Sequence, residues 1–242
     1  MERNRFTLDG RSVLLYRCNA PQILFLQPVD SHDTALLERQ LDAMRDCALP
    51  FALAAFSIAD WNRELSPWEA PPVFGREPFG GGAEETLRFL TDRLLPALFT
   101  RLSLPESIPL CLGGYSLAGL FALWTATRTD RFSGIAAASP SVWFPGWLDY
   151  AKAQPLRASR VYLSLGDREE RARNPVMATV GASIREQYEL LRPDHIVTLE
   201  WNPGNHFQDS EKRSARALCW IAAQEARPPA WASGSDSPEF DS

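Results

Sequence analysis

The chain has 242 residues, 45% of them hydrophobic, and a formal net charge of −5. This length suits one α/β domain with a sizeable core, and basic residues that are scattered rather than striped argue against nucleic acid or an anionic membrane as the main partner. No apolar stretch of a signal peptide follows the start, and the longest apolar run, residues 51–59, is far too short to span a bilayer. We therefore expect a cytoplasmic protein.

Four widely spaced cysteines are more typical of reduced thiols than of a disulfide framework. The chain has only three histidines, and none lies in a close Cys/His pair that would suggest structural zinc. We therefore expect neither a metal nor a cofactor. The sequence does not indicate an oligomeric state.

The amino-terminal part is expected to begin with an antiparallel hairpin over residues 6–18, because Asp9 and Gly10 form a favoured pair for a tight turn between two strands. Residues 22–26 are predicted to form a buried strand. Residues 27–30 are expected to be the loop in which that strand ends.

From there on, strand-like and helix-like stretches alternate, which predicts a mostly parallel central sheet with helices on both faces. Further strands are expected over residues 51–58, 108–112, 133–138, 160–165 and 196–201. Further helices are expected over residues 34–47, 84–98, the stretch after residue 116, 175–191 and 210–223. A single domain then spans residues 1–226, and a tail rich in Pro, Ser and Gly over residues 227–242 is expected to be disordered.

Residues 114–119 read GYSLAG and separate a predicted strand from an apolar helix. A serine at the tip of such a turn is the nucleophile elbow of α/β-hydrolases, in which the strand and helix backbones come so close that the flanking residues must be small. Gly114, Ala118 and Gly119 meet this need, although the strict pattern has Gly where this chain has Ala118. The alternative is an ordinary Gly-rich turn. We favour the elbow, with Ser116 as nucleophile, and hence the α/β-hydrolase fold.

Two more predicted strands are followed by residues that would complete a catalytic triad. An acidic turn follows residues 160–165 and His206 follows residues 196–201, so the order is serine, acid, histidine, as in α/β-hydrolases. The imidazole takes the proton of the serine, and the carboxylate orients the imidazole. His206 is the predicted base, because His195 stands at the wrong end of its strand and His32 could reach only the rim of the site.

The identity of the triad acid is less constrained, because Asp167, Glu169 and Glu170 all lie in one turn. Glu169, three residues after Gly166, is our first choice. Asp167 is the alternative acid. At most one of them completes the triad, and the others are expected to be solvated loop charges.

An oxyanion hole needs two backbone N–H groups, each worth on the order of 3 kcal/mol to the transition state. The amide of Leu117, directly after the nucleophile, is one predicted donor. The other is expected from residues 27–30, and since Pro28 has no N–H, we predict Val29.

Residues 60–82 leave the carboxyl end of a predicted strand and should therefore overhang the active site. Trp61, Arg63 and Trp68 in this segment are predicted to bind substrate, as is Tyr115 beside the nucleophile. The alternative is a rigid covering loop whose aromatic side chains simply bury apolar surface.

The motif around Ser116, the turn over residues 166–169 and the GNHF sequence over residues 204–207 resemble the putative-esterase branch of the α/β-hydrolases. That branch includes esterase D (S-formylglutathione hydrolase) and enterochelin-type siderophore esterases. The resemblance extends over roughly residues 6–225. It takes in residues 138–143, a segment that similar esterases place beside the nucleophile, and it implies that Trp143 contacts the substrate. The shared motifs are specific for the fold and the catalytic mechanism, but they say little about the substrate.

The predicted function is a serine hydrolase that cleaves a small-molecule carboxylic ester or thioester through an acyl-enzyme intermediate. One alternative is an acyltransferase with the same triad, in which an alcohol outcompetes water. A second is a non-catalytic binding protein with the α/β-hydrolase fold, which would have no need of an intact serine, acid and histidine.

Overall fold

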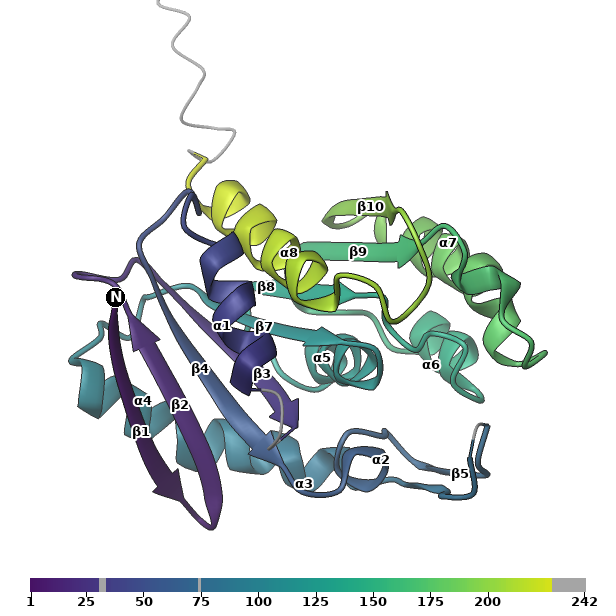
Figure 1. Cartoon of the computed structure of the whole chain (residues 1–242), viewed down its shortest axis with the longest axis horizontal. Helices are drawn as coiled ribbons and strands as arrows, with labels where there is room; N and C mark the ends of the chain where they lie inside the picture. Colours follow the sequence, from purple (N-terminus) through teal and green to yellow (C-terminus); the bar gives the residue numbers. More distant parts are fainter. Residues whose placement is uncertain (31–33, 74, 228–242) are drawn as a thin grey trace, which may run out of the picture.

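The computed structural model describes residues 1–30, 34–73 and 75–227 of the chain. It contains an eight-stranded sheet in the order β1-β2-β4-β3-β7-β8-β9-β10 (Figure 1). The strands are β1 (Glu2–Leu8), β2 (Arg11–Arg17), β3 (Ile23–Asp30), β4 (Phe51–Ile58), β7 (Leu110–Tyr115), β8 (Gly134–Ala138), β9 (Arg160–Gly166) and β10 (Ile196–Asn202). β2 pairs antiparallel with β1 and β4, and all other neighbours are parallel. The predicted hairpin and parallel sheet are therefore confirmed.

Helices cover both faces of the sheet. On one face lie α1 (Thr34–Ala43) and α8 (Ser210–Glu225), and on the other lie α3 (Ala83–Arg88), α4 (Leu95–Leu102), α5 (Leu117–Arg128), α6 (Trp147–Ala153) and α7 (Val180–Leu191) (Figure 1). Successive strand residues point to opposite faces. Accordingly, Ile23 and Phe25 join the cluster under α1 and α8, whereas Leu24 and Leu26 join the cluster under α3–α7.

The strand β3 is longer than the sequence suggested. It continues through Pro28 to Asp30, and Val29 lies opposite Ser57 in the pairing with β4. A proline is tolerated there because β7 pairs with β3 only as far as Leu26, so the missing N–H interrupts no pairing with β7. The expected loop over residues 27–30 is therefore strand.

The helix expected over residues 84–98 extends from Ala83 to Leu102 and is interrupted by a π-helical turn over Phe89–Leu94. Pro96 accounts for this turn, because a proline has no N–H to donate and clashes with the carbonyl four residues earlier. The amide of Leu95 accordingly bonds the carbonyl of Leu90, five residues back. The sequence pattern missed α6 altogether.

Among the described helices, none is both long and apolar enough to cross a membrane. All four cysteines are free. The tail that we expect to be disordered lies, from residue 228 onward, outside the described residues.

Candidate active site

The turn between β7 and α5 carries Ser116 in a strained conformation. Its φ is +59° and its ψ is −122°, a region that residues other than glycine rarely occupy. The strain is enforced by close packing, because a Cβ added to Gly114 would overlap the backbone carbonyl of Ala118. Since Gly114 has no side chain, the methyl group of Ala118 fits where the strict pattern has glycine. This is the geometry that defines a nucleophile elbow.

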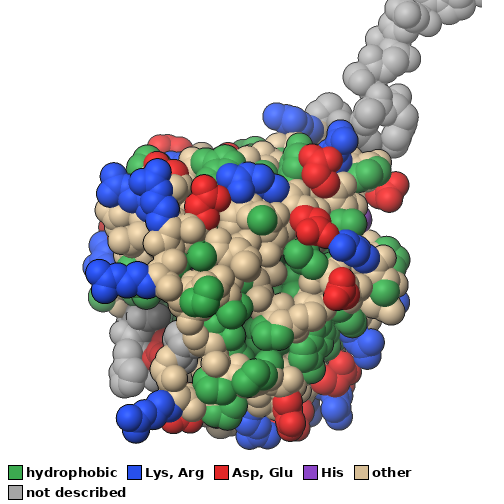
Figure 2. Space-filling view, turned by 90° about the vertical axis from the view of Figure 1, so that its right-hand side faces the viewer, with side chains coloured by type: hydrophobic (Ala, Val, Ile, Leu, Met, Phe, Trp, Pro, Cys, Tyr) green, Lys and Arg blue, Asp and Glu red, His purple; other side chains and the backbone are tan. Residues whose placement is uncertain are grey.

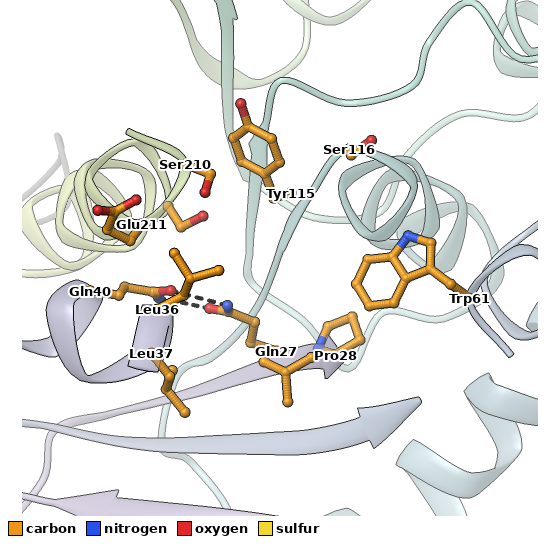
Figure 3. Close-up of a pocket in the computed structure, with 12 residues that line it drawn as sticks. Gln27, Pro28, Leu36, Leu37, Gln40, Trp61, Tyr115, Ser116, Ser210 and Glu211 are labelled. Atoms are coloured by element: carbon orange, nitrogen blue, oxygen red, sulfur yellow. Dashed lines mark hydrogen bonds between the residues drawn. The ribbon is translucent and has the colours of Figure 1, made fainter. Parts of the chain in front are cut away.

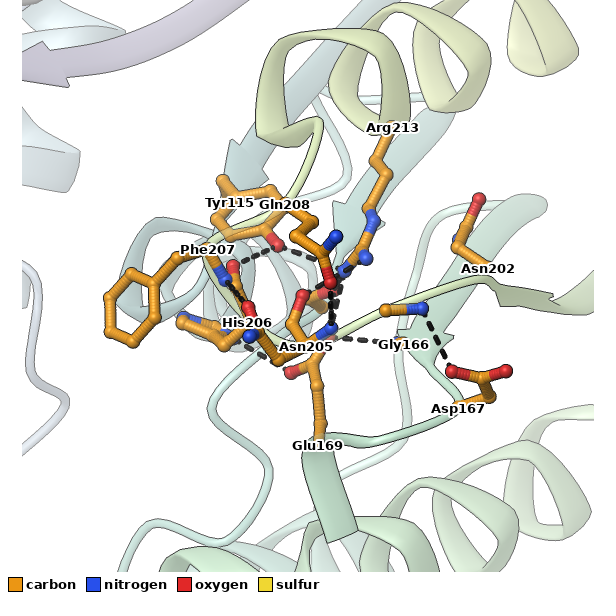
Figure 4. Close-up of polar contacts among 12 residues, drawn as sticks. Tyr115, Gly166, Asp167, Glu169, Asn202, Asn205, His206, Phe207, Gln208 and Arg213 are labelled. Carbon is orange, nitrogen blue, oxygen red and sulfur yellow. Dashed lines mark hydrogen bonds and ion pairs between the residues drawn. The ribbon is translucent and has the colours of Figure 1, made fainter. Parts of the chain in front are cut away.

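Three side chains from three strand ends meet at this turn. Ser116 Oγ lies 2.9 Å from His206 Nε2, and His206 Nδ1 lies 2.7 Å from Glu169 Oε2 (Figure 4 shows His206 and Glu169). Asp167, the alternative acid, does not contact His206. Its Oδ1 accepts a hydrogen bond of 2.8 Å from the amide of Gly204 and so braces the loop before the histidine.

Glu169 is buried, with 7% of its surface exposed. Burial alone would raise the pKa of its carboxyl, but hydrogen bonds from His206, Ser139 and the amide of Gly166 outweigh this and hold the pKa below its ordinary value of 4.5. The carboxylate is therefore ionised at neutral pH, as the orientation and stabilisation of an imidazolium require.

Arg213 on α8 is a site residue that the sequence analysis missed. It is 2% exposed, and its Nη1 lies 2.9 Å from Glu169 Oε1 (Figure 4). Its Nη2 donates to the backbone carbonyls of Pro203 and Asn205, in the loop that carries His206. The guanidinium of Arg213 thus holds both Glu169 and the loop that carries His206. Residues 213, 217 and 221 share one face of α8, and an arginine in line with Ala217 and Ile221 was the available signal.

Tyr115 supports the same loop from the strand side. Its hydroxyl donates a hydrogen bond of 2.6 Å to the carbonyl of His206 and accepts one of 3.2 Å from Arg213 Nη1. Burial raises the pKa of this hydroxyl, so it remains a donor at neutral pH. Tyr115 therefore helps to position His206 as well as lining the cavity at Ser116.

A cavity of roughly 140 Å³ lies beside Ser116, and its wall includes Tyr115 and Trp61 (Figure 3). The other lining residues are Gln27, Pro28, Val29, Leu36, Leu37, Gln40, Ser210, Glu211 and Ser214. Gln27 and Gln40 exchange two hydrogen bonds, of 3.1 and 2.8 Å, so the amide groups in this wall are already paired with each other. The structure therefore brings two of the predicted substrate-binding residues, Trp61 and Tyr115, to the nucleophile.

Arg63 and Trp68 lie elsewhere, which corrects the expectation that they wall the substrate pocket. The guanidinium of Arg63 pairs with Glu85 at 3.3 Å and lines a separate cavity. Trp68 donates to the carbonyl of Pro145 and packs against Phe144. These two residues follow the covering-loop alternative, because their partners on α3 and on the segment before α6 draw them away from Ser116.

The predicted oxyanion donors differ in outcome. Leu117 begins α5, where the first amides of a helix have no partner within the helix, and this amide stays a predicted donor. Val29 lines the cavity, but it pairs with β4. The amide of Leu24 bonds on the β7 side of β3. Along a strand that lies between two parallel neighbours, the amides of successive residues point alternately to one neighbour and to the other. The amide of Val29 thus faces β4 rather than Ser116, which argues against its predicted role.

Trp143, His195 and His32 are the remaining candidates from the sequence. Trp143, which is 9% exposed, lines a second cavity next to His206. His195 Nδ1 contacts the carbonyl of Ala158 at the amino end of β10, far in the fold from the strand ends that carry the site. His32 lies outside the described residues. Within the described residues, no group of His, Cys, Asp or Glu side chains could hold a metal ion, and the absence of a cofactor remains a prediction.

Several solved structures share this fold at low sequence identity. An IroE-like serine hydrolase from Shewanella oneidensis aligns with a TM-score of 0.76 and 14% identity over 94% of this chain and 82% of its own. The siderophore hydrolase EstB from Aspergillus nidulans aligns with a TM-score of 0.70 and 18% identity, over 94% and 96%. The enterobactin esterase Fes from Shigella flexneri aligns with a TM-score of 0.64 and 17% identity, over 93% of this chain and 59% of its own.

No curated protein shows significant similarity to the sequence. A family model described as putative esterase matches residues 38–192, which is well over half of the chain. The α/β-hydrolase fold and the esterase character expected from the sequence are thereby confirmed. The chain belongs to the putative esterase family of α/β-hydrolases and is an esterase-like serine hydrolase.

Proposed function

We propose that this protein hydrolyses a small-molecule carboxylic ester or thioester with Ser116 as nucleophile, His206 as general base and acid, and Glu169 as the orienting carboxylate. The observation that carries the proposal is the continuous chain of contacts from Ser116 Oγ to His206 Nε2, at 2.9 Å, and from His206 Nδ1 to Glu169 Oε2, at 2.7 Å. The strained backbone of Ser116 supports it, because the turn presents the hydroxyl above the sheet edge.

In the proposed reaction, Ser116 Oγ attacks the carbonyl carbon while His206 Nε2 takes the hydroxyl proton. The tetrahedral oxyanion is stabilised by the amide of Leu117. The intermediate collapses, the bond to the leaving oxygen or sulfur breaks, and His206 delivers its proton to that atom. Water then attacks the acyl-enzyme and gives its proton to His206, which releases the acid and restores Ser116. Glu169 stays ionised throughout and stabilises the imidazolium.

The similar structures, at 14–18% identity, share the fold alone with this chain. The proposal extends to a cytoplasmic location, which the four free cysteines support, since disulfides form in oxidising compartments.

The test is labelling of the purified protein with a fluorophosphonate, together with hydrolysis of a series of aryl esters, for the wild type and Ser116→Ala. We expect the wild type to be labelled and active. In Ser116→Ala, labelling should vanish and kcat should fall at least 10³-fold, because the nucleophile is gone, while the circular dichroism spectrum is unchanged. An unlabelled, inactive but folded wild type would instead favour a binding protein. Faster acyl transfer to an added alcohol than to water would favour an acyltransferase.

A further inference from the structure

A second cavity, of roughly 220 Å³, lies on the imidazole side of the triad. It is lined by His206 and Glu169 together with Trp143, Arg168, Arg171, Ala172, Met177, Val180, Asn205 and Phe207. Ser116 and Trp61 line the first cavity and not this one. The triad therefore stands between two spaces, one on the serine side and one on the histidine side.

The chemistry assigns the two halves of an ester to these two spaces. His206 Nε2 must hand its proton to the leaving atom, so the leaving group departs on the imidazole side. The carbonyl oxygen must face the amide of Leu117, at the start of α5, when Ser116 attacks. The acyl group then lies in the smaller cavity beside Ser116, and the leaving group lies in the cavity lined by His206.

The leaving-group cavity combines apolar surface with positive charge that forms no ion pair among the described residues. Trp143, Met177 and Phe207 provide the apolar wall, and Phe207 is 87% exposed. Figure 2 shows that apolar side chains gather on the face to which the strand ends point, with charged side chains around them.

Arg168 and Arg171 supply the charge, and within the described part of the chain neither has a carboxylate within 4.0 Å. The three nearest acids in sequence are engaged elsewhere. Asp167 accepts a hydrogen bond from the amide of Gly204. Glu169 contacts His206 and Arg213, and Glu170 pairs with Arg185 at 3.1 Å.

We propose that the leaving group of the natural substrate is an alcohol or thiol with an apolar body and a carboxylate, which Arg168 and Arg171 bind, and that the acyl group is small. A guanidinium presents paired N–H donors that match a carboxylate, and Trp143 and Phe207 flank the site where the apolar body would lie. The assignment rests on the proposed esterase function, because it takes His206 as the proton donor.

The test compares kcat/KM for three esters that differ in where the charge lies. 4-Acetoxybenzoate carries a carboxylate on its leaving group, methyl 4-acetoxybenzoate is its neutral counterpart, and the monophenyl ester of succinic acid carries the carboxylate on its acyl group. For the two acetates, each value is divided by the rate of spontaneous hydrolysis. The succinate is compared by kcat/KM itself, because its carboxylate attacks its own ester carbonyl and so accelerates its spontaneous hydrolysis. We expect 4-acetoxybenzoate to exceed the neutral ester roughly five- to tenfold, since two partly exposed ion pairs give gains of this order. The advantage should shrink in 0.5 M NaCl.

Arg168→Gln/Arg171→Gln should reduce this ratio to about one. Arg173→Gln is the matched control, because Arg173 is an exposed arginine of the same segment that does not line the cavity, and it should leave the ratio unchanged. Equal rates for the charged and neutral acetates, or a preference for the succinate, would overturn the assignment while leaving the esterase proposal intact. Failure to hydrolyse any of the three would count against the proposed function itself.

Discussion

At the scale of single residues, similar side chains that are close in sequence differ in whether they reach the other residues of the site. Glu169 and Asp167 stand two residues apart, but only Glu169 lies within hydrogen-bond distance of His206. The difference arises from the turn after β9, in which the amide of Gly166 holds Glu169 Oε1 at 2.7 Å and so fixes the carboxylate beneath the imidazole.

Replacement of the two acids should separate their roles. We expect Glu169→Gln to reduce kcat by about 10³-fold or more, because the amide cannot stabilise the imidazolium and can favour the wrong tautomer. Asp167→Asn should cost less than about fivefold, since its side chain can still accept the hydrogen bond from the amide of Gly204. The measurement is steady-state hydrolysis of phenyl acetate at pH 7.5. The opposite ranking would make Asp167 the acid of the triad.

Arg213 is expected to act as a positioning residue. Arg213→Met removes the donor to Glu169 Oε1 and to the carbonyls of the His206 loop, so the pKa of Glu169 rises and activity should fall most at acidic pH. The pH profile of kcat/KM tests this, and Arg213→Lys should recover part of the loss.

The matched control for Arg213→Met is Arg216→Met, since Arg216 lies on the same helix and contacts Asn202, away from the triad. A purely structural role for Arg213 would lower the amount of folded protein and leave the shape of the pH profile unchanged. That result would contradict the assignment.

At the scale of elements, β7 and α5 approach each other backbone to backbone at the elbow. The strand and the helix touch at Gly114 and Ala118, and a further turn over residues 139–144 packs against them. Ser141 in that turn donates its amide to the carbonyl of Ser116, and its hydroxyl lies 3.3 Å from Ser116 Oγ. Ser116 is therefore held by three segments of chain: β7, α5 and the turn after β8.

Two adjacent glycines in β7 should respond differently to the same change. In Gly114→Ala, the new methyl group meets the backbone of Ala118, which cannot move without shifting α5, and we expect a loss of about 3 kcal/mol or more in unfolding free energy. In Gly113→Ala, the methyl group approaches only Leu218 Cδ2, at 2.7 Å, and this flexible side chain can yield, so we expect about 1 kcal/mol. Urea unfolding measures both, and equal losses would contradict the close contact at Gly114.

At the scale of the whole molecule, the sheet and its two helix layers bring distant parts of the chain to one edge. Ser116, Glu169 and His206 follow β7, β9 and β10, whose carboxyl ends lie at the same edge of the sheet, with β8 between β7 and β9. Packing of α8 across β7, β8 and β9 adds Arg213 from near the carboxyl terminus. The site therefore assembles only when the whole domain folds. The ionised carboxylate of Glu169 should then contribute to the free energy of unfolding of the whole domain.

This coupling gives a pH dependence with a defined sign. The pKa of Glu169 is lower in the folded chain than its ordinary value of 4.5, so its contribution to stability is present above that pH and is lost as the pH falls through the folded value. We expect the wild type to lose more unfolding free energy between pH 7 and pH 4 than Glu169→Gln does. Urea titrations at both pH values test this, and identical losses would contradict it.

The fold class, the elbow and the order of serine, acid and histidine could be predicted from the sequence. These depend on local chemistry: the small residues that a tight strand-to-helix turn requires, the alternation of strands and helices, and the Asp9–Gly10 hairpin turn. Such features depend on residues that are close to one another in the sequence.

Three features could not be predicted from the sequence: the choice of Glu169 over Asp167 as the partner of His206, the buried position of Arg213, and the directions of the Arg63 and Trp68 side chains. Each depends on groups that are distant in sequence: Arg213 lies 44 residues from Glu169, and Trp68 lies 77 residues from Pro145. Likewise, β3 continues to Asp30 because β4 is there to pair with it. Contacts of this kind depend on how the layers pack, and no local pattern encodes them.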